Sequence, residues 1–469
     1  MVIDPSDNVE VRADGHKYAR VAISAGAAVI KYGMPIGHAV VDIAPGEHVH
    51  VHNLATNLDA ARVYRYEPDA CVAEPVSRID DGATFMGYRR ADGRAAVRND
   101  IWIVPTVGCV NALCVRLAAA CGGIALTHPY GCSQLGADHE TTADILAALC
   151  RNPNAGGVLV VSLGCENNTL DGFAARLGFA PGARGGATGS FEPGPDAACN
   201  VRFLRAQDPG DEYARGLALL AELDAVRPKT REPISVSELV VGLKCGGSDG
   251  FSGLTANPLV GRFSDWLVAR GGSAVLTEVP EMFGAEALLM RRCRTERVFE
   301  RCVAMVDGFK RYYSDHGQPC HENPSPGNKA GGITTLEDKS LGCVQKGGTS
   351  PVEDVLACGA RVRVRGLSLL SGPGNDLVST TLLAAAGCHL VLFTTGRGTP
   401  FGSVVPTVKI ASNDALAAAK PHWIDWNAMS DGDVSAFSRK VLAVASGERT
   451  RNEDGGDRGI AIFKDGVTL

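Results

Sequence analysis

Short apolar runs that end at glycine recur through the middle and the carboxy-terminal half of the chain. Four of these runs lead to a cysteine beside a glycine, at Cys109, Cys132, Cys165 and Cys245. A continuous apolar run of this length, closed by glycine, is typical of a strand that is buried on both faces of a parallel sheet. Segments of helical composition follow the first two runs, and such alternation predicts βαβ units of the α/β class.

The first 66 residues follow a different pattern. Short β-rich runs cover 18–23, 28–32, 38–43 and 48–52, and turn signals that contain glycine or proline separate them. This pattern predicts a small β module ahead of the α/β region.

Two connectors divide the rest of the chain. Residues 67–84 form a polar connector, and the proline-containing segment 227–233 separates a first α/β region from a second one. The second region has strand candidates at 239–243, 273–278, 366–370 and 389–395. The predicted units are a small β module over 1–66, an α/β domain over 67–230 and a carboxy-terminal α/β domain over 231–469.

Composition limits the partners that the protein can have. The chain has 469 residues, of which 45% are hydrophobic and 21% charged, and its net charge is -6. This acidic balance argues against nucleic acid or an anionic membrane as the partner. No signal stretch opens the chain and no apolar run is long and unbroken enough to span a membrane, so we expect a cytoplasmic protein that acts on a small molecule.

The chain contains 15 cysteines. Thiols stay reduced in the cytoplasm, which favours metal binding or catalysis for a subset of them and inert burial for the others. The cysteines interpreted as inert lie within helix-like or strand-like apolar patterns and are Cys114, Cys121, Cys150, Cys293, Cys302, Cys358 and Cys388.

The four glycine-flanked cysteines are the first candidates for chemistry. Open parallel sheets bind ligands outside the carboxyl ends of their strands, so these four side chains could converge on one site. Thiolates suit a soft or borderline metal such as iron or zinc. No Cys-x-x-Cys pair lies near them, which excludes a zinc ribbon or a ferredoxin signature. The alternative is that cysteine simply fits a tight turn beside glycine.

Histidines supply two further candidates. His128 follows a predicted strand and is a candidate general acid or base, unless it is hydrogen-bonded inside its turn. His48, His50 and His52 alternate, which on a strand places all three on one face, and His16 could complete a metal site there. A solvent-facing strand edge is the alternative interpretation.

Glycine-rich loops cover 245–253 and 323–332 and form a turn at 396–398. Backbone N–H groups in such loops bind anionic oxygens, and Lys329 and Arg397 would add charge-assisted contacts. Neither a Gly-x-Gly-x-x-Gly fingerprint nor a P-loop is present, so nucleotide binding is weakly supported. The loops favour a small polyanionic or polyhydroxy substrate.

Several of these stretches together resemble the altronate/galactarate dehydratase family. The matching stretches are 87–94, 98–99, 105–111, 128–135, 163–167, 244–257, 323–332, 393–400 and 461–467. The runs at 50–54, 128–136 and 138–142 are more similar to the altronate type than to the galactarate type. The resemblance implies a β-clip module of the SAF type at the amino terminus, and only 14 residues precede Gly15, fewer than the family usually carries, so we expect a shortened module.

The resemblance implies a metal-dependent elimination of water from a sugar acid, giving a 2-keto-3-deoxy acid. Divalent iron, or else manganese, is the metal that the family suggests, and a homo-oligomer, a dimer, is the expected assembly. His128, Lys329 and Arg397 are the expected catalytic residues. The expected substrate-binding residues are Arg98, Ser248, Asp249, Asn328 and Gly396. The expected iron ligands are Cys109, Cys132 and Cys165 with Cys245 as a weaker fourth, and His16, His50 and His52 form a candidate second site.

Other functions stay open at this stage. Another lyase of the same family, acting on sulfolactate or galactarate, would share these motifs. A sugar-acid binding protein without catalysis would bind the ligand and not convert it. An NAD-dependent oxidoreductase is disfavoured because the dinucleotide fingerprint is missing.

Overall fold

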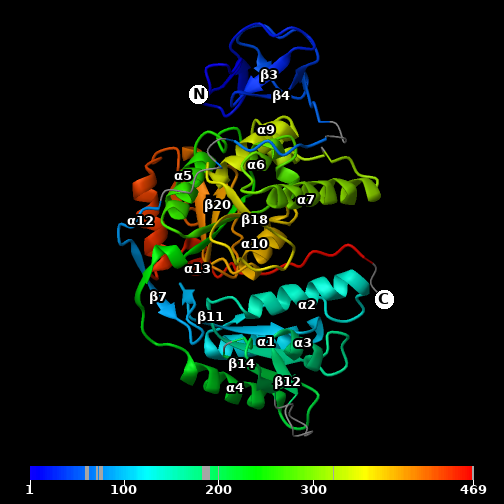
Figure 1. Cartoon of the computed structure of the whole chain (residues 1–469), viewed down its shortest axis with the longest axis vertical. Helices are drawn as coiled ribbons and strands as arrows, with labels where there is room; N and C mark the ends of the chain where they lie inside the picture. Colours follow the sequence, from blue (N-terminus) through cyan, green and yellow to red (C-terminus); the bar gives the residue numbers. More distant parts are fainter. Residues whose placement is uncertain are drawn as a thin grey trace.

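The computed structural model shows three bodies stacked along the long axis of the molecule (Figure 1). It describes the chain except residues 59–62, 70–71, 73–77, 182–190, 199, 321 and 467–469. The carboxy-terminal domain lies in the middle, between the amino-terminal β module and the second domain (Figure 1). Order in space therefore differs from order along the chain. Within the described residues, no helix is both long enough and apolar enough to cross a membrane.

The amino-terminal module contains two small antiparallel sheets with strand orders β1-β2-β5 and β3-β4-β6. Its strands are β1 (Val9–Val11), β2 (Lys17–Ala19), β3 (Ala28–Lys31), β4 (Met34–Ala39), β5 (His48–Val49) and β6 (Leu54–Ala55). Tyr32 and Gly33 both have positive φ, 62° and 70°, as a two-residue type I′ hairpin between β3 and β4 requires. This hairpin starts β4 at Met34, earlier than the run predicted over 38–43, and the segment before Gly15 supplies β1.

A buried ion pair network attaches the module to the carboxy-terminal domain. Lys17 Nζ lies 2.7 Å from one carboxylate oxygen of Asp338, and Lys31 Nζ lies 2.9 Å from the other. Lys17 also donates to the carbonyl oxygen of Gly332. Burial alone would raise the pKa of Asp338, but the two ammonium groups outweigh it and hold this pKa well below its usual range.

The second domain is built on an all-parallel sheet with strand order β10-β9-β11-β14. Its strands are β9 (Asp100–Pro105), β10 (Ile124–Ala125), β11 (Ala155–Ser162) and β14 (Val201–Arg205), and its helices are α1 (Asn111–Cys121), α2 (Gly136–Cys150), α3 (Leu170–Arg176) and α4 (Glu212–Val226). All eight residues of β11 are buried, as the continuous apolar run predicts. A separate antiparallel pair joins β12 (Phe179–Pro181) and β13 (Phe191–Pro193).

The carboxy-terminal domain contains a seven-stranded parallel sheet with order β18-β19-β17-β16-β20-β21-β22. Its strands are β16 (Val240–Cys245), β17 (Ser273–Leu276), β18 (Val352–Leu356), β19 (Gly366–Leu370), β20 (Leu390–Thr395), β21 (Thr407–Ala411) and β22 (Trp426–Asn427). Its helices are α5 (Ala256–Ala269), α6 (Glu286–Met290), α7 (Glu296–Asp315), α8 (Pro326–Ala330), α9 (Leu336–Cys343), α10 (Asp376–Ala385), α11 (Asp414–Ala419), α12 (Val434–Ala445) and α13 (Arg451–Gly455). The predicted α/β class is therefore confirmed.

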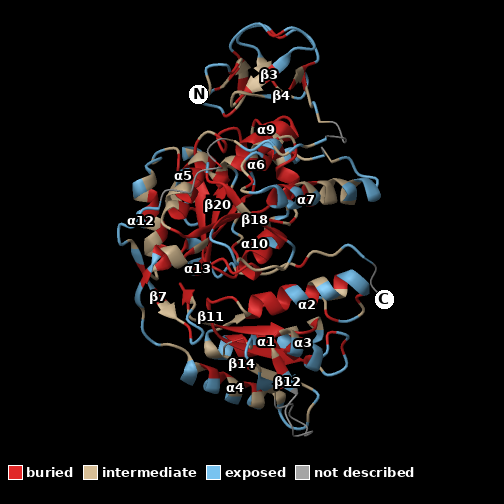
Figure 2. Ribbon diagram, viewed as in Figure 1, coloured by how far each residue is buried: buried red, intermediate tan, exposed pale blue. Residues whose placement is uncertain are grey.

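Helices cover both faces of this sheet. Phe263 of α5 and Phe437 of α12 meet edge to face on one side, with ring centroids 5.7 Å apart. On the other side α10 packs against the sheet and shares a hydrophobic core with α2 of the second domain. Figure 2 shows that the strands of both α/β domains and helix α10 are buried, whereas much of the amino-terminal module is exposed.

Both predicted connectors contribute to a further small sheet at the junction of the domains. Its strands are β7 (Thr84–Arg89), β8 (Ala95–Ala96) and β15 (Glu232–Ser235), in the order β15-β7-β8. Asn152 and Asn154 then tie the second domain to the carboxy-terminal domain. The Asn152 amide donates to the carbonyl oxygen of Ala384 at 2.8 Å, and the Asn154 amide donates to that of His389 at 2.7 Å.

The attachment of the module depends on Asp338. Asp338→Asn leaves Lys17 and Lys31 buried without their counter-charge, and we expect it to destabilise the docked module by about 3–5 kcal/mol. Chemical unfolding and limited proteolysis of the full chain measure the effect. In the wild-type protein this contribution is present above the unfolded pKa of 3.8 and is lost as the pH falls towards the lower folded pKa.

Glu10→Gln is the matched control for this prediction. Glu10 pairs with Arg12 at 3.0 Å, but both side chains are exposed to solvent. Its loss should change the free energy of unfolding by less than about 1 kcal/mol. An Asp338→Asn protein as stable and as protease-resistant as the Glu10→Gln protein would contradict the docking account.

Candidate active site

A cavity of about 980 Å³ opens at the carboxyl ends of the strands in the carboxy-terminal domain. Its lining includes the end of β16, the segment after β17, helix α8 and the segment 373–376 after β19. Strand β16 lies between β17 and β20 in the sheet. The chain therefore adds later strands on both sides of β16, and the strand order changes direction there. Open parallel sheets bind ligands at such a place, and the volume is typical of a small-molecule site, roughly 300–1,000 Å³.

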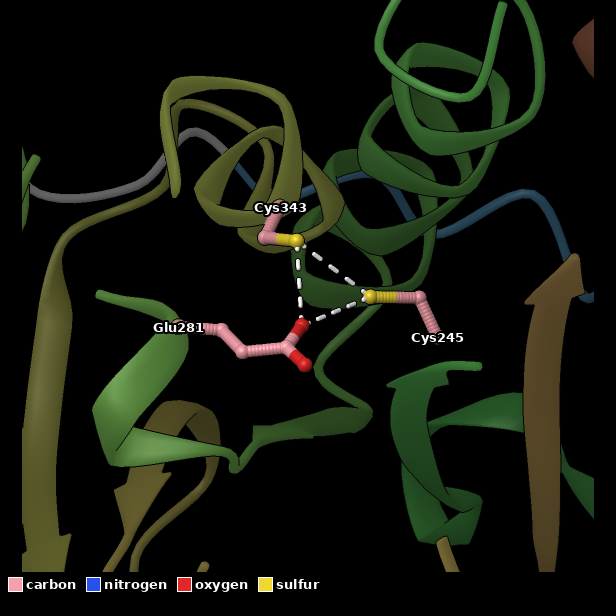
Figure 3. A group of neighbouring side chains, drawn as sticks. All are labelled: Cys245, Glu281 and Cys343. Carbon is pink, nitrogen blue, oxygen red and sulfur yellow. Dashed lines mark hydrogen bonds between the residues drawn. The ribbon is translucent and has the colours of Figure 1, made fainter. Parts of the chain in front are cut away.

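Two thiols and a carboxylate meet beside this cavity, and two of the three residues, Cys245 and Glu281, line it. Figure 3 shows the three side chains pointing toward one another. Cys245 is the last residue of β16, Cys343 is the last residue of α9, and Glu281 ends the 3₁₀ helix η4 (Val279–Glu281). The two Sγ atoms are 3.3 Å apart, and each lies 3.2 Å from Oε2 of Glu281. All three side chains are buried. Three different elements are therefore needed to form the group.

Buried lysines surround the two thiols and their carboxylate. Lys346, on the 3₁₀ helix η5 (Val344–Gly347), donates to Cys245 Sγ at 2.7 Å. Lys339 of α9 lies 2.8 Å from Glu281. Lys244, inside β16, forms an ion pair with Glu278. Each ammonium group is therefore held by an anionic or sulfur partner.

Glu278 organises the lysines from a strained backbone position. Its φ is 74°, a left-handed conformation that a residue with a bulky side chain rarely adopts. The carboxylate accepts from the backbone N–H of Cys245 at 3.0 Å and lies 3.0 Å from Lys346 Nζ. Burial, followed by the nearby Glu281, raises the pKa of Glu278, and Lys244 and Lys346 oppose that rise. These contacts hold Glu278 in its strained conformation. Such a conformation persists only when the surrounding structure fixes it in this way.

The same neighbours set the ionisation of the other two groups. For Glu281, burial opposes ionisation, but Lys339, Lys244 and Lys346 outweigh it and hold its pKa below the usual range. The pKa of Cys343 is raised well above its ordinary value by the hydrogen bond with Cys245 and by burial. Glu281 is therefore an anion at neutral pH, while Cys343 remains a neutral thiol in the absence of a further cation.

A charge count shows that this group suits a divalent cation. Three lysines and three carboxylates balance one another through ion pairs among Lys244, Lys339, Lys346, Glu278, Glu281 and Asp376. Ionising both thiols would add two uncompensated negative charges, which a divalent ion would neutralise. Two thiolates and one carboxylate oxygen suit iron or zinc. Among the described residues this is the one group of three or more such ligands within 4.8 Å of one another.

The structure does not bring the four glycine-flanked cysteines into one site, contrary to the expectation from the sequence. Cys245 is buried in the carboxy-terminal domain, whereas Cys109, Cys132 and Cys165 are exposed on the second domain. The reason is topological, because the strands before them belong to two separate sheets. Cys343, which partners Cys245 instead, also follows a glycine, but at the end of a helix.

A second cavity, of about 850 Å³, lies between the module and the carboxy-terminal domain. Three residues expected from the sequence line it, namely Asp249, Gly396 and Arg397. Asp249 accepts from Ser412 Oγ at 2.7 Å and from the Asn413 amide at 2.8 Å. A side chain at Gly396 would collide with Asp249, which explains the glycine.

The loop 245–249 and helix α8 separate the two cavities, and three more expected residues lie there. Asn328 lines the first cavity, donates to the carbonyl oxygen of Ser248 at 2.8 Å and accepts from Lys339 at 3.2 Å. Ser248 has a buried hydroxyl that lacks a hydrogen-bond partner within the described chain. Lys329 follows directly on α8 and is half-buried.

The side chains of His128 and Arg98 are both hydrogen-bonded within the chain. His128 Nε2 lies 2.9 Å from the carbonyl oxygen of Pro105, and Nδ1 accepts from the backbone N–H of Tyr130 at 3.1 Å. Both ring nitrogens are thus engaged, which matches the alternative of a histidine bonded inside its turn, and burial lowers its pKa. Arg98 is buried and its guanidinium is paired with Glu453 at 2.8 Å. Both side chains lack a free donor for a substrate.

The amino-terminal histidines gather, although not in the predicted way. The strand predicted over 48–52 ends at Val49, because Asn53 donates to the carbonyl oxygen of His48 and closes a turn. His16 Nδ1 nevertheless lies 3.1 Å from His48 Nε2, and the rings of His16 and His50 are 5.8 Å apart. His50 Nδ1 lies 2.9 Å from Thr334 Oγ1, and the ring of His52 lies 5.7 Å from that of His48.

Family models match three consecutive segments of the chain. They describe an altronate/galactarate dehydratase SAF domain over 2–57, the second domain of D-galactarate dehydratase/altronate hydrolase over 87–223, and a D-galactarate/altronate dehydratase carboxy-terminal domain over 236–468. The β module is therefore an SAF domain, as the resemblance implied.

Known proteins are similar over nearly the whole chain. The altronate dehydratase of Bacillus subtilis (strain 168) is 52% identical over 485 residues, covering 98% of this chain and 94% of that protein. The altronate dehydratase of Escherichia coli (strain K12) is 51% identical, covering 97% and 92%. The galactarate dehydratase (L-threo-forming) of Escherichia coli (strain K12) is 32% identical, covering 96% and 85%.

These similarities and the site define a class of enzyme, a sugar-acid dehydratase of the hydro-lyase type. The chain belongs to the altronate/galactarate dehydratase family. The family resemblance expected from the sequence motifs is thereby confirmed.

The charge balance around Glu278 generates a stability prediction. Glu278→Gln leaves Lys244 and Lys346 buried with too little negative charge, and we expect a loss of about 3–5 kcal/mol in the free energy of unfolding. Chemical unfolding followed by circular dichroism measures it. Glu448→Gln, which breaks the more exposed pair with Lys440, should cost about 1 kcal/mol or less. Equal stability of the two variants would refute the proposed balance.

Proposed function

We propose that this enzyme removes water from altronate and forms a 2-keto-3-deoxy acid. Near full-length similarity to two altronate dehydratases, at 52% and 51% identity, carries the choice of substrate. The proposed location is the cavity of about 980 Å³, because its wall combines a buried ammonium group, Lys339, with the carboxylates of Glu281 and Asp376.

Sugar-acid binding in this cavity would use the charges at its wall. The substrate carboxylate would pair with the ammonium group of Lys339, next to the Asn328 side chain that Lys339 already contacts. A charge-assisted contact of this kind is about twice as strong as a neutral hydrogen bond. The glycines of the loop at 246–247 line the same cavity and leave room for the sugar hydroxyls.

Elimination requires a base for the proton on C2 and an acid for the hydroxyl on C3. Asp376 is proposed for both tasks, because it lines the cavity and its side chain is about one third exposed. It would accept the C2 proton and return it to the departing hydroxyl, which leaves as water. The enol that remains then tautomerises to the keto acid. Lys244, 2.9 Å from Asp376, keeps the carboxylate oriented between the two transfers.

Divalent iron is the proposed metal, held by Cys245, Glu281 and Cys343. The donor set and the charge count of the group support this assignment. When bound, such an ion supplies Lewis-acid polarisation of substrate oxygens. The histidines at 16, 50 and 52 stay a candidate second site, supported by the closeness of their rings to His48 and to one another.

A substrate panel and two variants test the proposed function. Altronate should yield keto acid at least tenfold faster than galactarate, and sulfolactate should release no sulfite. Asp376→Asn and Lys339→Met should each lower kcat/KM for altronate by about 100-fold or more, as expected when a general base or a charge-assisted contact is removed. Lys420→Met, at a half-buried position beside Trp423 and outside both cavities, is the matched control and should keep full activity.

Arg397→Met decides between the two cavities. It should change kcat/KM less than threefold if the substrate binds beside Lys339. A large loss with Arg397→Met and none with Lys339→Met would move the site to the cavity of about 850 Å³. Thermal stabilisation by altronate without turnover, in protein supplied with Fe²⁺ under anaerobic conditions, would instead indicate a binding protein and contradict the proposal.

Cobalt reports directly on the two thiols. In protein freed of iron and sulfide, added Co²⁺ should produce the strong near-ultraviolet absorption of thiolate-to-cobalt charge transfer. Cys343→Ser should abolish or sharply weaken this absorption, because one of two thiolate ligands is lost. Cys302→Ser removes a buried thiol of α7 and should leave the spectrum unchanged. Identical spectra for both variants would place the metal elsewhere.

A further inference from the structure

Three exposed cysteines lie at one edge of the second domain and have no part in the site described above. Cys109, Cys132 and Cys165 come after β9, β10 and β11, which are neighbours in one parallel sheet. The carboxyl ends of parallel strands meet at the same edge of a sheet. In the order β10-β9-β11, the strand before Cys109 lies between the strands before the other two cysteines.

Hydrogen bonds join the three turns that carry these cysteines. The backbone N–H of Gly108 donates to the carbonyl oxygen of Tyr130 at 2.9 Å, and the Asn111 amide donates to that of His128 at 2.9 Å. These bonds hold the Cys109 turn against the Cys132 turn. Because they lie directly before and two residues after Cys109, this cysteine cannot move away from its neighbour without breaking them.

The Cys132 turn is tied to the Cys165 turn in the same way. The backbone N–H of Ser133 donates to Asn167 Oδ1 at 3.0 Å, and that of Asn168 donates to the carbonyl oxygen of Gly131 at 3.0 Å. Gly131 has a φ of 98°, and a side chain there would lie 1.9 Å from the carbonyl oxygen of Thr106. The backbones at Gly131 and Thr106 thus approach as closely as a glycine permits. The three turns that carry the thiols therefore form one hydrogen-bonded unit.

The spacing of these thiols disfavours a single metal ion as their shared ligand. Within the described chain, the three sulfur atoms are not among the ligand groups that lie within 4.8 Å of one another. One metal ion would need them closer. An iron–sulfur cluster holds cysteine sulfurs farther apart, because each sulfur binds a different iron.

Nearby polar groups support the same class of ligand. Gln207 donates to Cys165 Sγ at 3.6 Å, and Ser133 Oγ lies 3.9 Å from Cys132 Sγ. Hydrogen bonds to sulfur are a usual feature of cluster sites. Gln134, two residues after Cys132, is 4% exposed, and its Nε2 lacks a partner within the described residues. A buried donor without an acceptor has room for a partner that the chain itself does not supply, such as an ordered water or an anion.

We propose that Cys109, Cys132 and Cys165 bind an iron–sulfur cluster at this edge of the second domain. Three thiolates leave one iron of a four-iron cluster without a cysteine ligand, and the exposure of the three turns leaves that iron accessible to water or to an oxygen ligand. This site is separate from the Cys245–Glu281–Cys343 group and does not depend on the identity of the sugar acid.

Anaerobic reconstitution of the full chain with Fe²⁺ and sulfide tests the proposal. The wild-type protein should gain a broad visible absorption from sulfide-to-iron charge transfer, acid-labile sulfide and an electron paramagnetic resonance signal on reduction. Cys109→Ser, Cys132→Ser and Cys165→Ser should each lose the absorption and the sulfide. Circular dichroism confirms that the variants fold, and because the three side chains are exposed, folding should be unaffected.

Two controls make the result specific. Cys358→Ser removes an exposed cysteine of the carboxy-terminal domain and Cys343→Ser removes a thiol of the other group, and both should keep the cluster signals. Cluster signals that persist in all three test variants would overturn the proposal. So would bound zinc without sulfide. Altronate turnover measured in parallel separates the two proposals, because a chain without a cluster that still dehydrates altronate refutes only this one.

Discussion

The neutralisation of buried charge at the end of β16 is the constraint on which the rest of the active-site region depends. Three lysines and three carboxylates lie around two thiols, all of them buried except the partly exposed Asp376, and each charge is balanced by an opposite charge that touches it. The strained backbone of Glu278 follows from this need, because its carboxylate must reach Lys244, Lys346 and a backbone N–H together. A cavity with such a wall suits the sugar acid that we propose as its ligand.

Helix α9 connects this balance to the amino-terminal SAF domain. Asp338 faces Lys17 and Lys31 of that domain, and the next residue, Lys339, faces Glu281 in the active-site wall. Cys343 ends the same helix beside Cys245. A helix of eight residues thus carries both the anchor for the module and two groups of the site. The module is therefore linked through one helix to the wall of the proposed active site, even though it lies at one end of the molecule.

Local sequence patterns predicted the strands and much less of the site. Apolar runs closed by glycine located β9, β11, β16 and β19, because burial on both faces leaves a signal within a few residues. Which sheet a strand joins depends on contacts far along the chain, so the sequence pattern groups Cys245 with three cysteines that follow strands of another sheet. Lys244 lies inside an apolar strand, and Glu278 follows the end of another strand. Neither position in the sequence indicates that these two side chains form an ion pair. The roles of His128 and Arg98 depend on backbone acceptors that a sequence pattern does not contain.

The central claim is that the sugar acid binds against the charge-balanced wall beside Cys245, Glu281 and Lys339. A crystal structure of the slow Asp376→Asn variant with altronate measures this directly. The account predicts the altronate carboxylate within hydrogen-bonding distance of Lys339 Nζ, in the cavity at the carboxyl ends of β16 and β17. Altronate bound beside Arg397 and Asp249, in the cavity under the SAF domain, would contradict it.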